Sequence, residues 1–362
     1  MKLLRGLFRR ILSLLLLVLL AAGVLFLLPL TEQTDTEGLP QDASWMGTLP
    51  DSLRLNEITI PGTHASASQF TALPFFTRCQ ASGIGEQLAM GFRLLDVSLA
   101  VVGETNGMKL CSGSASCTVS ALPNAEALGL DAVLEECYAF LAEHPTETVL
   151  FSVTRQSGEA TVAEFEAVLY SHILQHAGSW LLTDTVPTLG EARGKLVLLR
   201  GYEDEARLGA VAGIPLVYAS QSGSKAALTA EAVSNGSYTL YVQDLADLND
   251  TDKWTAFTAG MAAGRAQTAL GNISLSFLST KGSLPVGHPW AHAQKLNAAL
   301  RNRGEDLSGW ILLDFGEPYL ARQIYESNAL YGTQTVSASA ASSAAASASA
   351  SGGSADPAMH IA

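Results

Sequence analysis

The sequence predicts an α/β fold with a mostly parallel sheet. Short apolar segments, typical of buried parallel strands, alternate with longer segments of helical pattern across residues 51–333, as βαβ units do. The chain has 362 residues, of which 48% are hydrophobic, so one large domain can bury a substantial core. No Gly-x-Gly-x-x-Gly motif follows the first expected strand, which disfavours a dinucleotide-binding open sheet and favours a (β/α)₈ barrel.

The expected elements follow from the apolar pattern along the chain. Strands are expected at residues 58–60, 92–101, 149–153, 195–199, 239–242, 273–278 and 310–313. Helices are expected at residues 128–143, 162–176, 254–266, 291–302 and 318–328. Pro145 ends the first of these helices, and Pro318 lies near the start of the last, where proline is tolerated.

The N-terminus predicts a membrane segment. Basic residues, including Lys2 and Arg5, precede an almost unbroken apolar run at residues 11–30, and a helix needs roughly 20 such residues to cross a bilayer. We expect residues 1–30 to be an uncleaved signal-anchor with its basic side in the cytoplasm, because the run is long and its small residues lie inside it. A cleaved signal peptide is the alternative. The domain is then single-pass and extracellular at the cell membrane, or secreted if the signal is cleaved.

The flanking segments differ from the predicted domain in composition. Residues 31–50 are polar and contain proline and glycine, so we expect a stalk between the membrane and a barrel at residues 51–333. Residues 334–362 are rich in serine and alanine and have almost no large apolar side chains, which predicts a disordered tail.

The cysteine count fits an exported domain. An even number of cysteines permits disulfides outside the cytoplasm, and three pairings are possible, among which the sequence does not choose. The cysteines are Cys79, Cys111, Cys117 and Cys137. Buried free thiols are the alternative. The formal net charge of −13 argues against nucleic-acid binding, which requires a basic surface.

Six segments resemble the phosphatidylinositol-specific phospholipase C family. "ITIPGTHAS" is similar to the family's first catalytic motif, "GEQLAMGFRLLDVSL" to its second strand motif, and "CYAFLAEHPTETVLFSV" to its helix-loop-strand segment. "GEARGKLVLLRGY", "LYVQDLADLNDTDKW" and "GWILLDF" are similar to three later segments and follow in the same order. The resemblance implies a distorted TIM (β/α)₈ barrel, in which reactive residues lie where strands end.

The resemblance also implies a reaction and the residues for it. The family cleaves the phosphodiester between inositol and diacylglycerol by attack of an inositol hydroxyl, which needs a base, an acid and positive charge near the phosphate. His64 matches the general base, and Asp314 matches the carboxylate that orients it. Asp96 matches a second catalytic carboxylate, and Asp244 matches an acidic residue that contacts inositol hydroxyls. A phospholipid headgroup and a membrane are the implied partners.

The chain departs from the family pattern around this site. The substituted positions are Ala65 for Asp or Asn, Ser98 for the arginine or acidic residue, Ser112 for the acid histidine, and Ala246 for a stacking aromatic residue. No cofactor is expected. Calcium is the alternative, but it needs several oxygen ligands at once, and the substitutions at Ala65 and Ser98 remove two candidates and leave the ligand set incomplete. Ser98 and Ser112 remain as substrate-binding candidates, since serine donates hydrogen bonds but is a poor acid.

Other residues are candidates for the missing functions. Arg155, and less strongly Arg200, are candidates for the phosphate charge, and His288 or His292 for the acid. The sequence therefore supports two hypotheses: a phosphodiesterase, or an impaired pseudoenzyme that binds a lipid headgroup or surface partner. A glycosidase would need paired carboxylates about 5–9 Å apart, and the ordered motifs argue against it.

Overall fold

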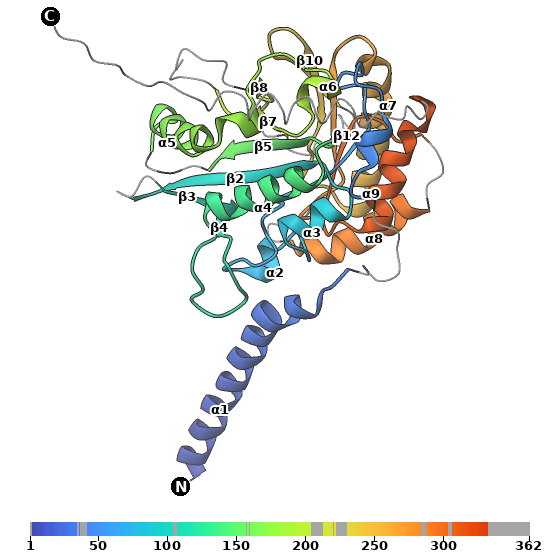
Figure 1. Cartoon of the computed structure of the whole chain (residues 1–362). Helices are drawn as coiled ribbons and strands as arrows, with labels where there is room; N and C mark the ends of the chain where they lie inside the picture. Colours follow the sequence, from blue (N-terminus) through green and yellow to red (C-terminus); the bar gives the residue numbers. More distant parts are fainter. Residues whose placement is uncertain are drawn as a thin grey trace, which may run out of the picture.

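Eight parallel strands form the wall of a barrel in the computed structural model (Figure 1). The structure describes residues 2–34, 36, 42–103, 107–156, 158, 160–203, 213–219, 221, 230–283, 287–302 and 306–331. The wall strands are β1 (Ile60–Thr63), β2 (Leu94–Val102), β5 (Val149–Arg155), β7 (Leu196–Arg200), β8 (Ile214–Pro215), β10 (Thr239–Gln243), β11 (Ile273–Phe277) and β12 (Trp310–Leu313). Because β1 pairs in parallel with both β2 and β12, the first and last strands meet, as in a (β/α)₈ barrel.

The barrel is distorted because its wall is open on one side. The hydrogen-bonded order is β6-β7-β5-β2-β1-β12-β11-β10-β9, with β8 on β7, and within the described ranges no strand pairing joins β8 to β9 or β10. Short additional strands extend the sheet: β3 (Gly107–Ser112), β4 (Ala115–Ser116), β6 (Trp180–Leu181) and β9 (Glu231–Ser234). The predicted barrel is confirmed, although these short strands and β8 were not expected from the sequence.

Helices cover the outside of the barrel. They are α2 (Pro74–Thr77), α3 (Ile84–Ala89), α4 (Leu130–Glu143), α5 (Val162–Gln175), α6 (Leu189–Ala192), α7 (Asp250–Thr268), α8 (Pro289–Arg301) and α9 (Pro318–Tyr325). Caps fix several boundaries: Thr161 forms a capping box at α5, and the side chain of Asn249 accepts hydrogen bonds from two amides at the start of α7. The helix α7 therefore begins at Asp250, before its predicted start.

Both faces of each wall strand are buried, which explains their continuous apolar sequences. On β5, Leu150 belongs to the cluster inside the barrel, whereas Val149 and Phe151 pack with the helices outside. This alternation follows from the two-residue repeat of a strand. The same repeat decides which polar side chains point into the barrel at the strand ends.

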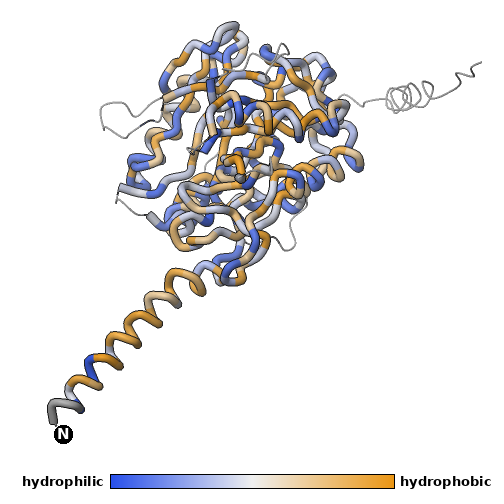
Figure 2. Tube along the Cα trace, turned by 90° about the vertical axis from the view of Figure 1, so that its left-hand side faces the viewer, coloured by the Kyte–Doolittle hydropathy of each residue, from blue (hydrophilic) through white to orange (hydrophobic). Residues whose placement is uncertain are grey.

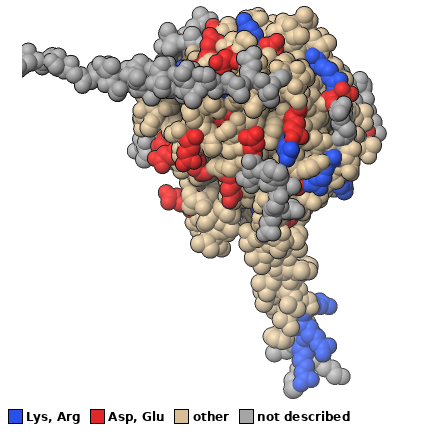
Figure 3. All heavy atoms as spheres, turned by 45° about the vertical axis from the view of Figure 1, so that its right-hand side comes forward, with Lys and Arg blue, Asp and Glu red and all other residues tan. Residues whose placement is uncertain are grey.

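The N-terminal helix stands clear of the barrel and is apolar over most of its length (Figure 2). It comprises α1 (Lys2–Ala22), which continues through a π-helical and a 3₁₀ turn to Thr31. The segment Arg5–Thr31 contains an 18-residue window with a mean hydropathy of 3.1, none of which is buried, so the segment has the length and composition to cross a membrane. Its basic residues lie at the far end from the barrel (Figure 3).

The predicted stalk at residues 31–50 contacts the barrel, which differs from a free linker. Arg78 donates to the carbonyl oxygens of Pro29 and Glu32, and the Glu32 side chain is buried. Further on, Trp45 and Met46 are buried in the barrel cluster, so the folded domain begins before residue 51. The burial of these apolar side chains outweighs the polar composition of the segment. The predicted tail at residues 334–362 lies outside the described residues.

All four cysteines are buried free thiols, which is the alternative left open by the sequence. Cys117 and Cys137 lie in the cluster between the sheet and α4, where they pack as small apolar side chains.

Candidate functional site

A cavity of about 280 Å³ opens at the carboxyl ends of the wall strands. Its described lining comprises His64, Leu94, Asp96, Ser98, Ser152, Thr154, Gly201, Leu216, Tyr218, Asp244, Leu275, Phe277 and Leu312. Reactive groups of TIM barrels gather at this end, because every parallel strand delivers its last side chains there. Four of the predicted site residues therefore share one cavity: His64, Asp96, Ser98 and Asp244.

His64 and Asp314 form the central pair of the site. The strands β1 and β12 pair with Thr63 opposite Leu313, so the next residues, His64 and Asp314, emerge side by side. The Nδ1 atom of His64 lies 2.7 Å from Oδ1 of Asp314, whose side chain is 4% exposed against 35% for the histidine. Because Asp314 holds Nδ1, Nε2 is the nitrogen left for a substrate.

The charge of Asp314 changes the acidity of His64. Burial by itself lowers the pKa of His64, but the carboxylate charge and hydrogen bond of Asp314 raise it more, so the pKa lies well above that of ordinary histidine. Contacts with Cys79 act in the same direction. The pair therefore stabilises the protonated imidazole that forms when a histidine accepts a proton.

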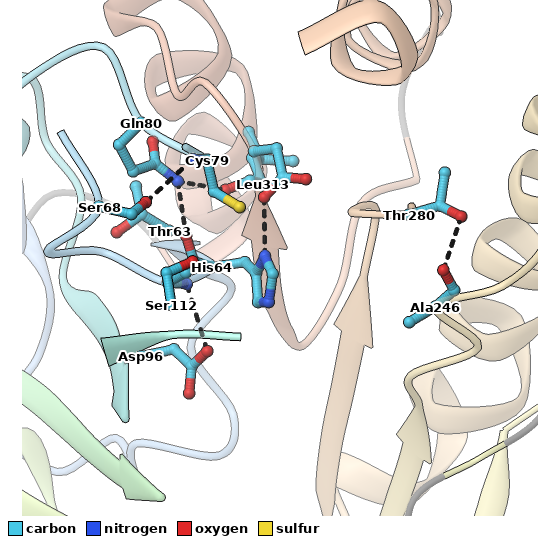
Figure 4. Close-up of polar contacts among 12 residues, drawn as sticks. Thr63, His64, Ser68, Cys79, Gln80, Asp96, Ser112, Ala246, Thr280 and Leu313 are labelled. Carbon is cyan, nitrogen blue, oxygen red and sulfur yellow. Dashed lines mark hydrogen bonds and ion pairs between the residues drawn. The ribbon is translucent and has the colours of Figure 1, made fainter. Parts of the chain in front are cut away.

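The backbone at the pair is held by a buried glutamine. The side-chain nitrogen of Gln80 donates to the carbonyl oxygens of His64 and Leu313, at 2.7 and 2.9 Å (Figure 4). Its side-chain oxygen accepts from the amide of Gly316 at 3.1 Å. One side chain thus ties the ends of β1 and β12 together and fixes the spacing of the two catalytic candidates.

Asp96 lies beside this pair on β2. Its Oδ2 atom accepts from the amide of Ala65 at 3.4 Å, and its own amide donates to the hydroxyl oxygen of Ser66 at 2.8 Å. Burial raises the pKa of Asp96, while the charge of His64 and the Ala65 amide partly offset that effect. The Ala65 backbone adopts a positive φ of 44°, which alanine rarely does, so the turn after His64 is strained.

Asp244 faces the cavity from the end of β10. Its Oδ2 atom accepts a hydrogen bond of 3.1 Å from the hydroxyl of Tyr218, and its amide donates to the side chain of Gln221 at 2.7 Å. Burial raises the pKa of Asp244, and the charge of Lys253 lowers it in part. Lys253 itself is fully buried, donates to the carbonyl oxygen of Leu245 at 3.1 Å, and has a pKa lowered by burial to about 8.

The predicted arginines do not reach the cavity. On β5, Ser152 and Thr154 point inward, so Arg155 falls on the outer face by the two-residue repeat, and it donates to the carbonyl oxygen of Ala160. Arg200 on β7 likewise donates to the carbonyl oxygen of Tyr202. The described lining contains no lysine or arginine, so a phosphate there has no direct cationic partner among these residues.

The predicted replacement acids are also engaged elsewhere. His288 donates to the carbonyl oxygen of Phe75 and its Nε2 lies 2.9 Å from Glu32, whereas Nδ1 of His292 lies 2.5 Å from Asp250. Ser112 is not in the cavity lining, because its hydroxyl donates to the carbonyl oxygen of Thr77 at 2.6 Å. Of the two predicted serines, the structure brings only Ser98 to the cavity.

Two residues of the site were missed by sequence reasoning. Tyr218 follows the two-residue strand β8, which is too short to leave a periodic signal, and Cys79 lies in the segment after α2. Burial raises the pKa of the Cys79 thiol, while its contacts with His64 and Ser112 lower it in part. The spacing from the "PGTH" motif gives no indication that this cysteine returns to the histidine.

Comparisons with known proteins agree with the geometry of the barrel. No protein-family model matches the chain. The 1-phosphatidylinositol phosphodiesterase of Staphylococcus aureus strain Newman is 24% identical over 308 residues, which cover 79% of this chain and 94% of that protein. The protein of the same name from Listeria monocytogenes is 26% identical over 164 residues, which cover 43% of this chain and 47% of that protein.

Solved structures share the fold. A phosphatidylinositol-specific phospholipase C from Staphylococcus aureus superposes with a TM-score of 0.63 at 20% identity, covering 79% of this chain and 97% of that one. The corresponding protein from Listeria monocytogenes gives a TM-score of 0.58 at 18% identity, covering 80% of this chain and 99% of that one.

Proposed function

Because the chain is a divergent relative of the bacterial phosphatidylinositol-specific phospholipases C, we propose that it is a phospholipase C-like phosphodiesterase acting on a glycerophospholipid headgroup. The observation that supports this proposal most directly is the His64–Asp314 pair, which lies at the cavity beside Asp96 and Asp244. The two phosphodiesterases that match the chain in sequence carry phosphatidylinositol in their names, so an inositol headgroup is the first substrate to test.

In the proposed reaction, Nε2 of His64 accepts the proton of the attacking hydroxyl as its oxygen forms a bond to phosphorus. The bond from phosphorus to the glycerol oxygen breaks, and the leaving oxygen takes a proton from solvent water. Asp314 holds Nδ1 and stabilises the imidazolium that results. Asp244 and Tyr218 receive hydroxyl groups of the headgroup, and Ser98 donates a hydrogen bond to a phosphoryl oxygen. We propose that the reaction needs no resident metal. The phosphoryl charge then lacks a cationic partner, so we expect turnover to be slow.

We place this reaction at the outer side of the cell membrane. The helix that ends at Thr31 serves as the anchor, and the basic residues at its far end remain in the cytoplasm. The barrel then meets phospholipids of the membrane in which it is anchored. If the helix is cleaved as a signal, the barrel is secreted.

A second candidate function is an impaired phospholipase-like protein that binds a lipid headgroup or a surface partner without turnover. The observation that favours it is the cavity lining, in which the described residues include no arginine, no lysine and no second histidine. Binding of a polyhydroxylated headgroup needs only hydrogen-bonding groups, and Asp96, Asp244 and Tyr218 supply them.

The release of water-soluble inositol phosphate separates these functions. The full-length chain is reconstituted with phosphatidylinositol in mixed micelles, and product is measured with calcium and with a chelator. Turnover that is lost in His64→Ala, but retained in the matched surface variant His176→Ala, supports the phosphodiesterase. Headgroup binding without product formation supports the second function, and neither binding nor turnover contradicts both.

A further inference from the structure

We propose that His64, Cys79 and Asp314 form a binding site for a thiophilic divalent cation, of which zinc is the physiological example. One ligand atom from each residue, an imidazole nitrogen, a thiol sulfur and a carboxylate oxygen, lies within 4.8 Å of the others. They come from three separate segments: the end of β1, the connection after α2, and the end of β12. Figure 4 shows the thiol of Cys79 turned toward the ring of His64.

The three segments are tied together around these ligand atoms. The amide of Phe315, next to Asp314, donates to the carbonyl oxygen of Cys79 at 2.6 Å. The amide of Cys79 in turn donates to the hydroxyl of Ser68 at 3.0 Å. Together with the bridge made by Gln80, these bonds hold the ligand set before any ion arrives, which reduces the ordering cost of binding.

The chemistry of the ligands selects the class of ion. Zinc accepts nitrogen, sulfur and oxygen ligands in tetrahedral geometry, whereas calcium and magnesium require oxygen ligands in larger number. Ligand atoms around zinc stand about 3.3–3.8 Å apart, so small side-chain movements complete the site. Three protein ligands leave one position open for water, and His64 faces the cavity through which water enters.

The site has a consequence for the reaction proposed above. A cation bound to Nδ1 of His64 replaces the proton that Asp314 holds, and the histidine can no longer form a stabilised imidazolium. Zinc binding therefore prevents His64 and Asp314 from accepting the proton and inhibits the proposed reaction. Cys79 makes this inhibition possible because it supplies the thiol ligand. This consequence rests on the proposed function, whereas the binding of the ion does not.

Cadmium binding tests the site without any measurement of turnover. Cadmium is titrated into the full-length protein, free of any metal-binding tag, and the thiolate-to-cadmium charge-transfer absorption in the near ultraviolet is recorded. We expect one equivalent to bind and zinc to compete for it. In Cys79→Ser the band disappears and cadmium affinity falls by about a hundredfold or more, whereas the buried-cysteine control Cys137→Ser retains both.

His64→Ala provides the second variant, because this side chain is partly exposed and its truncation leaves the fold intact. The thiolate band then persists at an affinity that is lower by about tenfold or more. A band that survives in Cys79→Ser, or affinity that is unchanged in His64→Ala, overturns the site. If zinc binds but does not inhibit the release of inositol phosphate, only the regulatory consequence is contradicted. If the protein shows no turnover at all, the proposed function is contradicted, but the result on metal binding still stands.

Discussion

The two sides of the barrel mouth are built very differently. Where β1 meets β12, a buried carboxylate, a histidine and a bridging glutamine are fixed by short hydrogen bonds. Along β2, β5 and the residue that follows β7, the cavity is lined by Asp96, Ser98, Ser152, Thr154 and Gly201, none of which carries a positive charge. The machinery for moving a proton is thus present on one side, while the other side lacks a group to neutralise a phosphate. A barrel can therefore keep the geometry of an active site and still have little capacity for turnover.

The largest expected effect is a loss of turnover when the carboxylate that holds His64 is replaced. Asp314→Asn leaves the shape of the pair but removes the charge that stabilises the imidazolium, so turnover should fall by about a thousandfold or more. The matched control is Asp131→Asn, which removes the carboxylate 2.5 Å from His172 on the outer surface. Equal loss in both variants would indicate a general effect on folding. Inositol phosphate release and thermal unfolding check this prediction.

The next effect is on the pH dependence of stability and comes from Lys253, a buried lysine near the acidic residues of the cavity. Lys253 faces Asp244, Asp314 and Asp247, and burial lowers its pKa to about 8. The unfolded lysine has a pKa of about 10.4, so between these values the unfolded state binds more protons, and the stability of the native protein rises with pH. The lowered pKa destabilises the folded protein below pH 8 by a free energy on the order of a few kcal/mol, and this destabilisation disappears as the pH rises above 10.

Lys253→Met removes this titration. We expect the free energy of unfolding of the native protein to rise from pH 8 to pH 10 relative to that of the variant, as measured by denaturant unfolding. Lys295→Met is the control, because Lys295 is an exposed residue on α8 paired with Asp250. Parallel pH profiles for the native protein and Lys253→Met would show that Lys253 binds its proton equally in the folded and unfolded states, and would contradict a lowered pKa.

A smaller effect is expected from adding a positive charge to the cavity lining, whose described residues include no lysine or arginine. Ser98→Arg places a guanidinium in the cavity, where it stabilises phosphoryl oxygens, and turnover should rise by about tenfold. Ser114→Arg adds the same charge at the exposed β3–β4 turn and controls for attraction to the surface of the mixed micelle. If both variants increase turnover equally, surface attraction explains the gain and the missing charge in the cavity does not limit the reaction.

The smallest effect distinguishes headgroup binding from chemistry. Tyr218→Phe removes one hydrogen bond to Asp244, so KM should rise by about fivefold with little change in kcat. Tyr319→Phe, at an exposed position on α9, should change neither constant. A fall in kcat alone would assign Tyr218 to the chemical step instead.

Apolar strand patterns and the resemblance of six segments predicted the barrel and the proximity of His64 to Asp314. Apolar runs identify buried strands, and residues that follow adjacent parallel strands must meet, as His64 and Asp314 do. Arg155 was a candidate for the phosphate charge because of the family resemblance, but its neighbours Ser152 and Thr154 take the inward face. Counting the two-residue repeat along β5 would have corrected it.

Other parts of the site depend on contacts between distant segments. Cys79 and Tyr218 lie in connections whose paths are set by packing, so no periodicity in the sequence marks them. The burial of Trp45 and Met46 also depends on such contacts. The sequence shows that two apolar residues stand within a polar segment, but it does not show that they pack in the barrel cluster. Tertiary contacts therefore determine where these residues lie, and a sequence pattern alone does not predict such contacts.

The contact between Arg78 and the end of the N-terminal helix has a geometric consequence. Arg78 binds the carbonyl oxygens of Pro29 and Glu32, and its neighbour in the chain is Cys79, which lies against His64. If the helix serves as the anchor proposed above, this contact holds the barrel at a fixed height above the lipid surface. The proposed enzyme would then search for substrate by lateral diffusion in the leaflet of its own membrane. Lipids on a neighbouring cell or vesicle would lie beyond its reach.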